Sequence, residues 1–141
     1  MDQYTLGFIF NQDSSEVLLM HKNRPDWQMG KVNGVGGKIE ANEESTDCIV
    51  REVQEETGVQ TQVENWAYFG EIHGKKWRVD LYAMLYFEAT DNFTSTTDEK
   101  IEWFNINDLP DNILDNLNWI IPMAINKIKN KEIMSCSVEY E

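Results

Sequence analysis

The segment from Ser45 to Thr57 restricts the fold more than any other part of the sequence, because it is helix-compatible and divides its residues between two opposite faces. Gly58 follows it as a C-terminal stop, and Asn42 or Ser45 is placed to cap its start. Aliphatic residues share one face, where they can anchor the helix: Ile49, Val50 and Val53. We therefore expect a helix that packs on a sheet.

The other face of this expected helix carries three glutamates, Glu52, Glu55 and Glu56, at positions i, i+3 and i+4. Like charges at this spacing destabilise an isolated helix by roughly 0.2–0.5 kcal/mol per pair, so the cluster suggests a compensating cation. Mg²⁺ fits best, with Mn²⁺ as a substitute, because it prefers oxygen ligands and usually keeps waters and substrate phosphates beside one or two carboxylates. The glutamates therefore indicate an open metal site that faces a cleft.

Residues around the helix start supply a scaffold for this face. Arg51 lies one turn before Glu55 and can also reach back to Glu43, which would hold the preceding loop. Three glycines permit backbone conformations closed to other residues, and could aim a carbonyl at a metal ion or admit a phosphate: Gly34, Gly36 and Gly37. Taken alone, a Glu-rich helix is more often a solvated acidic surface.

The spacing of these residues matches, at every defined position, the Nudix box GX5EX7REUXEEXGU, in which U is an aliphatic residue. The nine matching positions are Gly37, Glu43, Arg51, Glu52, Val53, Glu55, Glu56, Gly58 and Val59. Such a pattern across 23 residues is specific, and it favours a functional site over a solvated surface. The chain thus resembles the Nudix hydrolases.

The resemblance implies the Nudix fold, a mixed sheet between helices, and hydrolysis of a nucleoside diphosphate linked to another moiety. It implies that the metal ligands are Glu52, Glu55 and Glu56, with the backbone at Gly37 contributing. The structural members of the box would be Glu43, Arg51 and Gly58.

Residues outside the box resemble the MutT-type branch of this family, particularly the enzymes that destroy oxidised purine triphosphates. The similar segments lie between residues 4 and 110, and include Tyr4-Thr5-Leu6, Val17-Leu18-Leu19, Asn33-Gly34, Gly36-Gly37-Lys38 and Trp103-Phe104. In that branch an aromatic residue and an asparagine before the box contact the base, and Trp27 and Asn33 stand at those positions. The branch's later Trp-Pro-Asp-Asp segment is replaced here by residues 113–119 (ILDNLNW), so the resemblance does not extend to oxidised-guanine specificity.

Hydrolysis of a phosphoanhydride requires neutralised charge, a water in line, and a base for that water's proton. We expect Glu55 or Glu56 to accept the proton, assisted by Glu99, although Asp98 and Glu99 could equally be surface charge. Three cations could pair with phosphates or remain solvated: Lys22, Arg24 and Lys38. Attack at the α/β linkage would release a nucleoside monophosphate and pyrophosphate.

Short apolar runs elsewhere predict the rest of the sheet. The expected strands are residues 4–10, 16–20, 66–73, 77–87 and 102–106, of which the first two form a hairpin. Apolar residues at helical spacing predict a second helix from Asn112 to Lys129, bent or restarted at Pro122. Strands interleaved with two helices predict one mixed α/β (α+β) domain over residues 1–141, in which helices cover a sheet.

Several single residues could suggest a function, but each has a simpler structural interpretation. His21 and His73 belong to no metal-spaced cluster, so we expect them at the surface near strand ends. Four tryptophans are expected in the core or at its rim: Trp66, Trp77, Trp103 and Trp119. Cys48 and Cys136 are expected to be free thiols, because neither lies in a CxxC pair.

Composition excludes several classes of function. A formal net charge of −13 would repel the phosphate backbone of DNA or RNA, so the expected substrate is a small nucleotide and not a polymeric nucleic acid. No apolar run reaches the roughly 18 residues that span a bilayer, so no membrane partner is expected. The first residues do not resemble a signal peptide, which favours a cytoplasmic protein, and we expect a monomer or homodimer.

The expected function is Mg²⁺-dependent hydrolysis of a nucleoside triphosphate, 8-oxo-dGTP or another (d)NTP, to a nucleoside monophosphate and pyrophosphate. Two alternatives to it remain. One is a hydrolase of ADP-ribose, a sugar nucleotide or a dinucleoside polyphosphate, for which residues outside the box decide. The sequence has no proline at the downstream position associated with ADP-ribose enzymes and no upstream coenzyme A signature. The other is a non-catalytic nucleotide-sensing module, against which the complete box argues.

Overall fold

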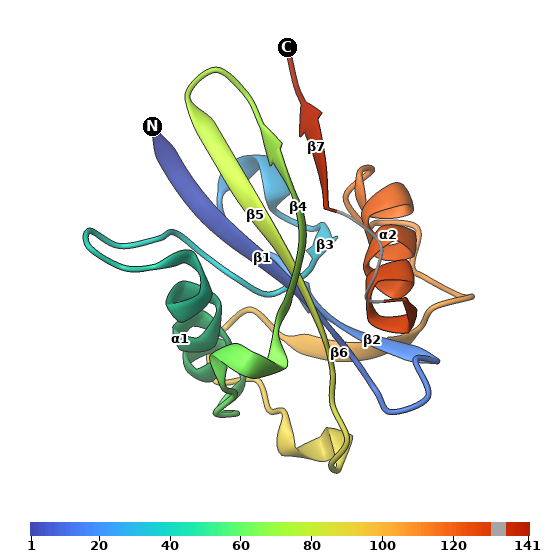
Figure 1. Cartoon of the computed structure of the whole chain (residues 1–141). Coiled ribbons are helices and arrows are strands. Elements are labelled where there is room, and N and C mark those ends of the chain that lie inside the picture. The colour runs from blue at the N-terminus through green and yellow to red at the C-terminus, as the bar shows by residue number, and fades with distance from the viewer. Residues whose placement is uncertain (131–134) are drawn as a thin grey trace.

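The computed structural model describes residues 1–130 and 135–141, and its centre is a seven-stranded mixed sheet (Figure 1). The strands are β1 (Asp2–Phe10), β2 (Glu16–His21), β3 (Val32–Asn33), β4 (Ala67–His73), β5 (Trp77–Leu85), β6 (Ile101–Asn105) and β7 (Cys136–Glu139). They follow the order β3-β2-β1-β5-β4-β7, and β6 pairs with β2 beside that path. β1 lies parallel to β5, with Tyr4 opposite Val79, and β7 lies parallel to β4, while the other pairs are antiparallel.

Two helices lie on opposite sides of this sheet (Figure 1). They are α1 (Ser45–Thr57) and α2 (Leu117–Lys129), and three short 3-10 turns connect other elements: η1 (Asp26–Gln28), η2 (Val63–Asn65) and η3 (Thr90–Asn92). The predicted architecture, a mixed sheet between helices, is therefore confirmed. In the described part of the chain, neither helix has the length and apolar character needed to cross a bilayer.

Alternation along β1 builds a separate apolar core on each face of the sheet. Phe8 and Phe10 are fully buried in the core that includes Leu117 of α2. Ile9, between them, belongs to the core that includes Ile49 of α1. Both helices are thus anchored on the same central strand, and the acidic face of α1 is left pointing away from the sheet.

The first helix has the expected bounds, Ser45–Thr57, and Gly58 ends it in the left-handed region at φ 79°. The expected cap was wrong. The N-cap residue is Glu44, and no side chain caps the helix start. Ser45 instead donates its hydroxyl to the Asp80 carboxylate of β5 at 2.6 Å, which ties the first turn of α1 to the sheet.

The second helix begins five residues later than the expected Asn112, at Leu117. The reason is that the preceding backbone pairs with β3: Ile113 forms a bridge with Val32, and the Leu114 N–H donates to the Val32 carbonyl at 3.0 Å. Pro122 lies inside α2, which continues through it without a restart.

The five expected strands are present within one or two residues of their predicted bounds, and β1 and β2 form the predicted hairpin. Two strands were not predicted, β3 and β7. Both are short, and neither has an apolar run that distinguishes it from a loop. Cys48 and Cys136 are free thiols, as expected.

Candidate active site

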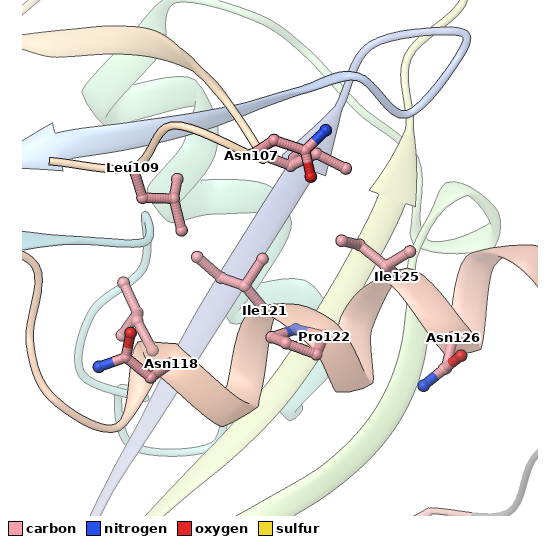
Figure 2. Close-up of a pocket in the computed structure, with 9 residues that line it drawn as sticks. Asn107, Leu109, Asn118, Ile121, Pro122, Ile125 and Asn126 are labelled. Carbon is pink, nitrogen blue, oxygen red and sulfur yellow. The ribbon is translucent and has the colours of Figure 1, made fainter.

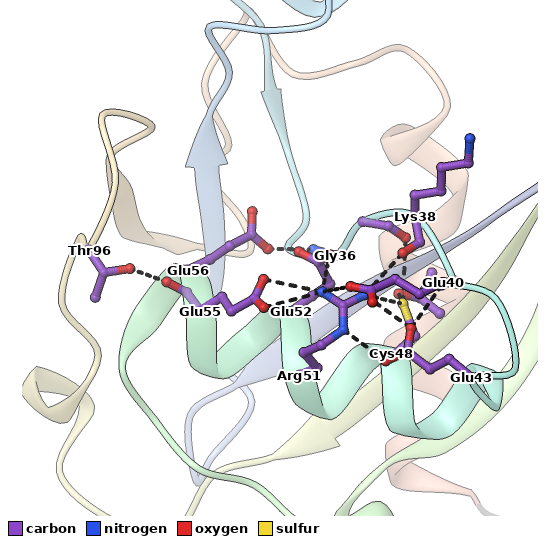
Figure 3. Close-up of polar contacts among 12 residues, drawn as sticks. Gly36, Lys38, Glu40, Glu43, Cys48, Arg51, Glu52, Glu55, Glu56 and Thr96 are labelled. Atoms are coloured by element: carbon purple, nitrogen blue, oxygen red, sulfur yellow. Dashed lines mark hydrogen bonds and ion pairs between the residues drawn. The ribbon is translucent and has the colours of Figure 1, made fainter.

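Glu56 is the most buried of the three glutamates on α1, with 9% of its surface exposed. One carboxylate oxygen accepts the backbone N–H of Gly36 at 3.0 Å (Figure 3). Burial, together with the neighbouring charge of Glu52, raises the pKa of Glu56 to about 8. The raised pKa favours the protonated, neutral form of Glu56, and a cation bound beside it would favour the anionic form.

Arg51 lies at the centre of the acidic cluster (Figure 3). Its guanidinium donates to both carboxylate oxygens of Glu43, at 2.8 and 3.0 Å, and to the carbonyl of Lys38 at 3.1 Å. The hydrogen bonds from Arg51 hold the pKa of Glu43 at about 2. The expected contact between Arg51 and Glu43 is thus present, and it closes the loop that precedes α1.

The same guanidinium also reaches the acidic face of α1. We call it the metal face because the predicted metal ligands lie on it. Its Nη1 lies 3.0 Å from Glu52 and 3.2 Å from Glu55, on the following turn of the helix. Glu52 is mostly buried, and that burial raises its pKa, whereas the Glu55 side chain is 57% exposed. Arg51 therefore neutralises part of the repulsion among the glutamates.

Gly37 makes room for the Glu52 carboxylate. A Cβ at this position would overlap the carboxylate of Glu52, so a larger residue would push the end of the Glu52 side chain out of its place. The Gly37 carbonyl, which the resemblance places near the metal, accepts the N–H of Thr5 at 2.8 Å. Gly36, the neighbour that contacts Glu56, has φ 151°.

The donor set on this face suits a hard divalent cation. Three carboxylates lie on consecutive turns of α1, and two of them are shielded from water with raised pKa values. Within residues 1–130 and 135–141, no three acidic, histidine or cysteine side chains are already gathered around one point. Binding of Mg²⁺ would therefore draw Glu52 and Glu55 away from Arg51.

Glu99 lies in the loop before β6 and is 6% exposed. Its carboxylate contacts the ammonium of Lys22 at 3.1 Å and the backbone N–H groups of Asn23 at 2.7 Å and Arg24 at 3.2 Å. Burial alone would raise the pKa of Glu99, but these hydrogen bonds and the Lys22 charge hold it below its usual value. The interpretation of Glu99 as surface charge is therefore wrong, because it is a buried ion-pair partner.

The two residues expected to contact the base lie on neighbouring segments. Trp27 is in η1 and is 70% exposed. Asn33 is buried on β3, where its amide donates to the Gln28 side chain at 3.1 Å and accepts the N–H of Gly34 at 2.8 Å. The turn that carries Trp27 is thus connected to Asn33 through Gln28.

The three cations considered for phosphate binding have different positions. Lys38 points away from the glutamates (Figure 3), and its ammonium lies 3.3 Å from Asp2. Arg24 is exposed and pairs with Asp98 at 2.6 Å. Lys22 is the least exposed of the three, with 14% of its side chain exposed, and its charge acts on Glu56 as well as on Glu99.

The remaining single residues are placed as expected. His21 ends β2 and pairs with Glu102, His73 ends β4, and Trp66 is buried in the core. Trp77, Trp103 and Trp119 are partly buried against the two cores. Among the described residues, none of these side chains forms a hydrogen bond or ion pair with Glu52, Glu55 or Glu56.

An apolar hollow of about 420 Å³ lies elsewhere, between α2 and the segment after β6 (Figure 2). Its walls are mainly aliphatic, and asparagines surround them: Ile106, Asn107, Leu109, Leu117, Asn118, Ile121, Pro122, Ile125 and Asn126. None of the residues expected to bind metal or nucleotide lines it. The candidate chemistry belongs to the α1 side of the sheet.

Sequence reasoning missed two functional contacts at this site. Lys22 is expected either to pair with a phosphate or to remain solvated, but its ammonium instead pairs with the buried Glu99. Asp80 is not singled out in the sequence, although it is 5% exposed and accepts the Ser45 hydroxyl. Both contacts join segments far apart in the sequence, so no local pattern predicts them.

Comparison of this chain with known proteins identifies its family from the sequence and finds solved structures with a similar fold. The model of the NUDIX domain family matches residues 2–123. An NAD-capped RNA hydrolase NudC of Vibrio parahaemolyticus is 31% identical over 103 residues, which are 68% of this chain and 36% of the relative. The chain spans about a third of the length of the curated relatives it matches.

Solved structures agree on the fold. A structure from a study of MutT of Aliivibrio salmonicida and Vibrio cholerae superposes with a TM-score of 0.69 at 23% identity, covering 89% of this chain and 98% of the other. A MutT NUDIX hydrolase of Burkholderia pseudomallei gives a TM-score of 0.73 at 18% identity, covering 86% and 96%. At these identities the likeness is one of fold.

Proposed function

This chain belongs to the NUDIX domain family, and we propose that it is a Mg²⁺-dependent hydrolase that cleaves a nucleoside triphosphate to a nucleoside monophosphate and pyrophosphate. The observation that carries the proposal is the acidic face of α1. Glu56 is 9% exposed on that face, and burial raises its pKa to about 8, so the site is built to receive a cation. Mn²⁺ would substitute for Mg²⁺.

In this proposal Glu52, Glu55 and Glu56 hold the ion, with the backbone at Gly37 beside them. The bound ion would neutralise phosphate charge and lower the pKa of an attacking water. The water oxygen bonds to the α-phosphorus, the α/β phosphoanhydride bond breaks, and pyrophosphate leaves. The proton of the water passes to a carboxylate.

We assign that proton to Glu55 or Glu56. Glu55 is 57% exposed and is free to move once its contact with Arg51 is released, and Glu56 lies one residue further along the same face of α1. Glu99 would assist only indirectly, because its carboxylate is already held by hydrogen bonds from neighbouring residues and does not itself take the proton.

The nucleoside would lie toward η1 and β3. Trp27 offers an exposed indole for stacking, and Asn33 offers an amide that can donate and accept. Of the basic candidates, Lys22 is the one directed to the interior of the site, and Lys38 would have to leave Asp2 to meet a phosphate.

A second candidate is hydrolysis of a nucleoside diphosphate linked to another moiety, such as a dinucleotide, ADP-ribose or a sugar nucleotide. The name of the NudC relatives supports it, at 31% and 35% identity over about two thirds of this chain. The relatives are much longer than this chain, and a net charge of −13 opposes a polymeric RNA substrate. A non-catalytic sensing module stays the least favoured alternative, because the box is complete.

A panel of normal and oxidised nucleoside triphosphates, NAD, ADP-ribose and sugar nucleotides, assayed with Mg²⁺ in ¹⁸O-labelled water, tests the proposal. We expect the triphosphates to give a nucleoside monophosphate that carries the label, and pyrophosphate without it. Labelled orthophosphate as the main product would contradict attack at the α/β linkage, and turnover of NAD alone would favour the second candidate.

Glu56→Gln is the matched variant for the metal face, because it keeps the side-chain shape and removes a ligand. We expect the rate with saturating Mg²⁺ to fall well over tenfold, or by more than about 1.4 kcal/mol in the barrier. Asp47→Asn is the control, since it removes an exposed carboxylate from the first turn of the same helix. A wild-type rate for Glu56→Gln would contradict the assignment of Glu56 as a metal ligand.

A further inference from the structure

The segment from Lys22 to Lys31, which carries Trp27, is held at its start by one carboxylate from a distant loop. The two oxygens of Glu99 accept three hydrogen bonds and form one further ion pair. Oε1 contacts Lys22 at 3.1 Å and the guanidinium of Arg24 at 3.6 Å, and Oε2 accepts the backbone N–H groups of Asn23 at 2.7 Å and Arg24 at 3.2 Å.

Trp27 has little anchorage of its own. It is 70% exposed, and η1 contains no buried residue. The ends of the segment are closed by backbone hydrogen bonds, from the Lys22 N–H to the Lys31 carbonyl at 2.8 Å and from the Gly30 N–H to the Lys22 carbonyl at 2.9 Å. Asn33 also donates to the Gln28 side chain at 3.1 Å, and Asn112 donates to the Gly30 carbonyl at 3.0 Å. Because these contacts lie after Trp27, the approach to Trp27 depends on where Lys22, Asn23 and Arg24 are held.

The Glu99 contact differs from an ordinary surface ion pair. Glu99 and Lys22 have side chains that are 8% and 14% exposed, so their hydrogen bonds are shielded from water and from salt. Next to it, Asp98 and Arg24 form a pair at 2.6 Å whose side chains are 62% and 60% exposed. The chain thus offers a buried and an exposed carboxylate on the same loop, facing the same segment.

From this geometry we propose that Glu99 is a positioning residue: its carboxylate holds the segment from Lys22 to Lys31 so that Trp27 stands ready for the nucleobase, and it neither takes the proton of the attacking water nor binds the metal. The proposal rests on the proposed function, in which Trp27 stacks on the base. Three hydrogen bonds and the nearby charge of Arg24 already hold both oxygens of Glu99, and only 8% of its side chain is exposed to water or a cation.

Glu99→Gln tests this with little change in volume, and Asp98→Asn is its matched control. A glutamine amide can accept at one side only, so either Lys22 or the two backbone N–H groups lose their acceptor. Hydrogen exchange of the segment 22–31 should become faster by at least about tenfold in Glu99→Gln, and should stay within about twofold of wild type in Asp98→Asn.

Kinetics and binding then separate positioning from catalysis. For Glu99→Gln we expect KM to rise about tenfold while kcat stays within about threefold of wild type. The Kd of an α,β-methylene triphosphate analogue should rise in parallel with KM. The Kd of Mn²⁺ alone, followed by electron paramagnetic resonance, should not change.

The double variant Trp27→Ala/Glu99→Gln completes the test. If Glu99 acts through Trp27, the double variant should bind the analogue no more weakly than the weaker single variant, within about twofold. Additive losses, unchanged hydrogen exchange, a fall in kcat above about a hundredfold at constant KM, or weaker Mn²⁺ binding would each overturn the proposal. A different result would contradict the proposed function itself, namely a Glu56→Gln variant with the full activity of the wild type.

Discussion

The Glu56 carboxylate accepts the backbone N–H of Gly36 at 3.0 Å, and this contact joins the metal face of α1 to the glycine-rich loop that crosses in front of β1. A buried carboxylate with one neutral donor is poorly stabilised as an anion. If Glu56 is a metal ligand, as we propose, a proton and a metal ion would compete for its carboxylate.

This competition predicts a pH dependence of stability. Because the folded pKa of Glu56, about 8, lies above the ordinary 4.5, folding binds the proton more tightly, and the free energy of unfolding falls as pH rises from 4.5 toward 8. Glu52 shifts in the same direction. Glu43, with a pKa of about 2, has the opposite sign, but its stabilisation is lost only below its ordinary value, outside this range.

Thermal midpoints of the metal-free protein should therefore fall between about pH 5 and pH 8, and saturating Mg²⁺ should remove most of that fall. Differential scanning calorimetry with and without a chelator measures both trends. In Glu56→Gln the metal-free trend should be much flatter. Parallel curves with and without Mg²⁺ would mean that the ion does not bind these carboxylates.

Arg51→Ala should lower stability as well as activity, because Arg51 holds Glu43, the Lys38 carbonyl and two glutamates of the metal face. We expect a loss of about 2–4 kcal/mol, since a partly buried carboxylate loses its partner. Lys38→Ala is the control, because its pair with Asp2 is exposed and should be worth less than about 0.5 kcal/mol. Equal thermal midpoints for Arg51→Ala and wild type, with a large rise in KM, would place Arg51 on the substrate instead.

Substitution of neighbouring glycines should separate stability from function. A Cβ at Gly36 would overlap the backbone carbonyl of Thr5, and its φ of 151° excludes most side chains, so Gly36→Ala should be severely destabilised. A Cβ at Gly37 meets only the flexible end of Glu52, so Gly37→Ala should keep most of its stability and lose metal affinity. Gly30→Ala, at φ 79° in open space, should cost only about 1–2 kcal/mol. Urea unfolding and Mn²⁺ titration of the three variants measure this, and a Gly37→Ala protein with wild-type Mn²⁺ affinity would contradict it.

Trp27→Ala should raise KM for several nucleotides together, with about 1–3 kcal/mol lost if its stacking resembles that of single-strand binders. Asn33→Ala should instead change the ratio of kcat/KM between purines, because an amide selects through hydrogen bonds. Both variants need the same nucleotide panel with saturating Mg²⁺. If neither KM nor the ratios change, the base lies elsewhere on the protein.

Much of this arrangement could be predicted from sequence because it is local. The helix from Ser45 to Thr57 follows from its aliphatic and acidic periodicity and from Gly58, and the contact between Arg51 and Glu43 follows from their spacing on and before that helix. The strands with apolar alternation were found for the same reason. Each of these patterns is complete within about 20 residues of sequence.

The rest depends on contacts between distant segments. Residues 112–116 have helical periodicity, yet Ile113 and Leu114 pair with Val32, and the sheet overrides the local preference. Glu99 gives no sign in the sequence of being buried, because Lys22, Asn23 and Arg24 reach it only in the folded chain. β3 and β7 are too short for any periodicity to separate them from loops.

The parallel pairing of β7 with β4 has a consequence for how this protein can be handled. From Gly70 to His73, β7 covers the outer side of β4, and the Tyr140 N–H adds a bond to the His73 carbonyl at 2.7 Å. β7 is itself the edge of the sheet, but it has only 4 residues, and without it the edge would be β4, which has 7. A longer row of unpaired amides and carbonyls invites another chain to pair, so we expect a shortened protein that lacked β7 to self-associate more readily.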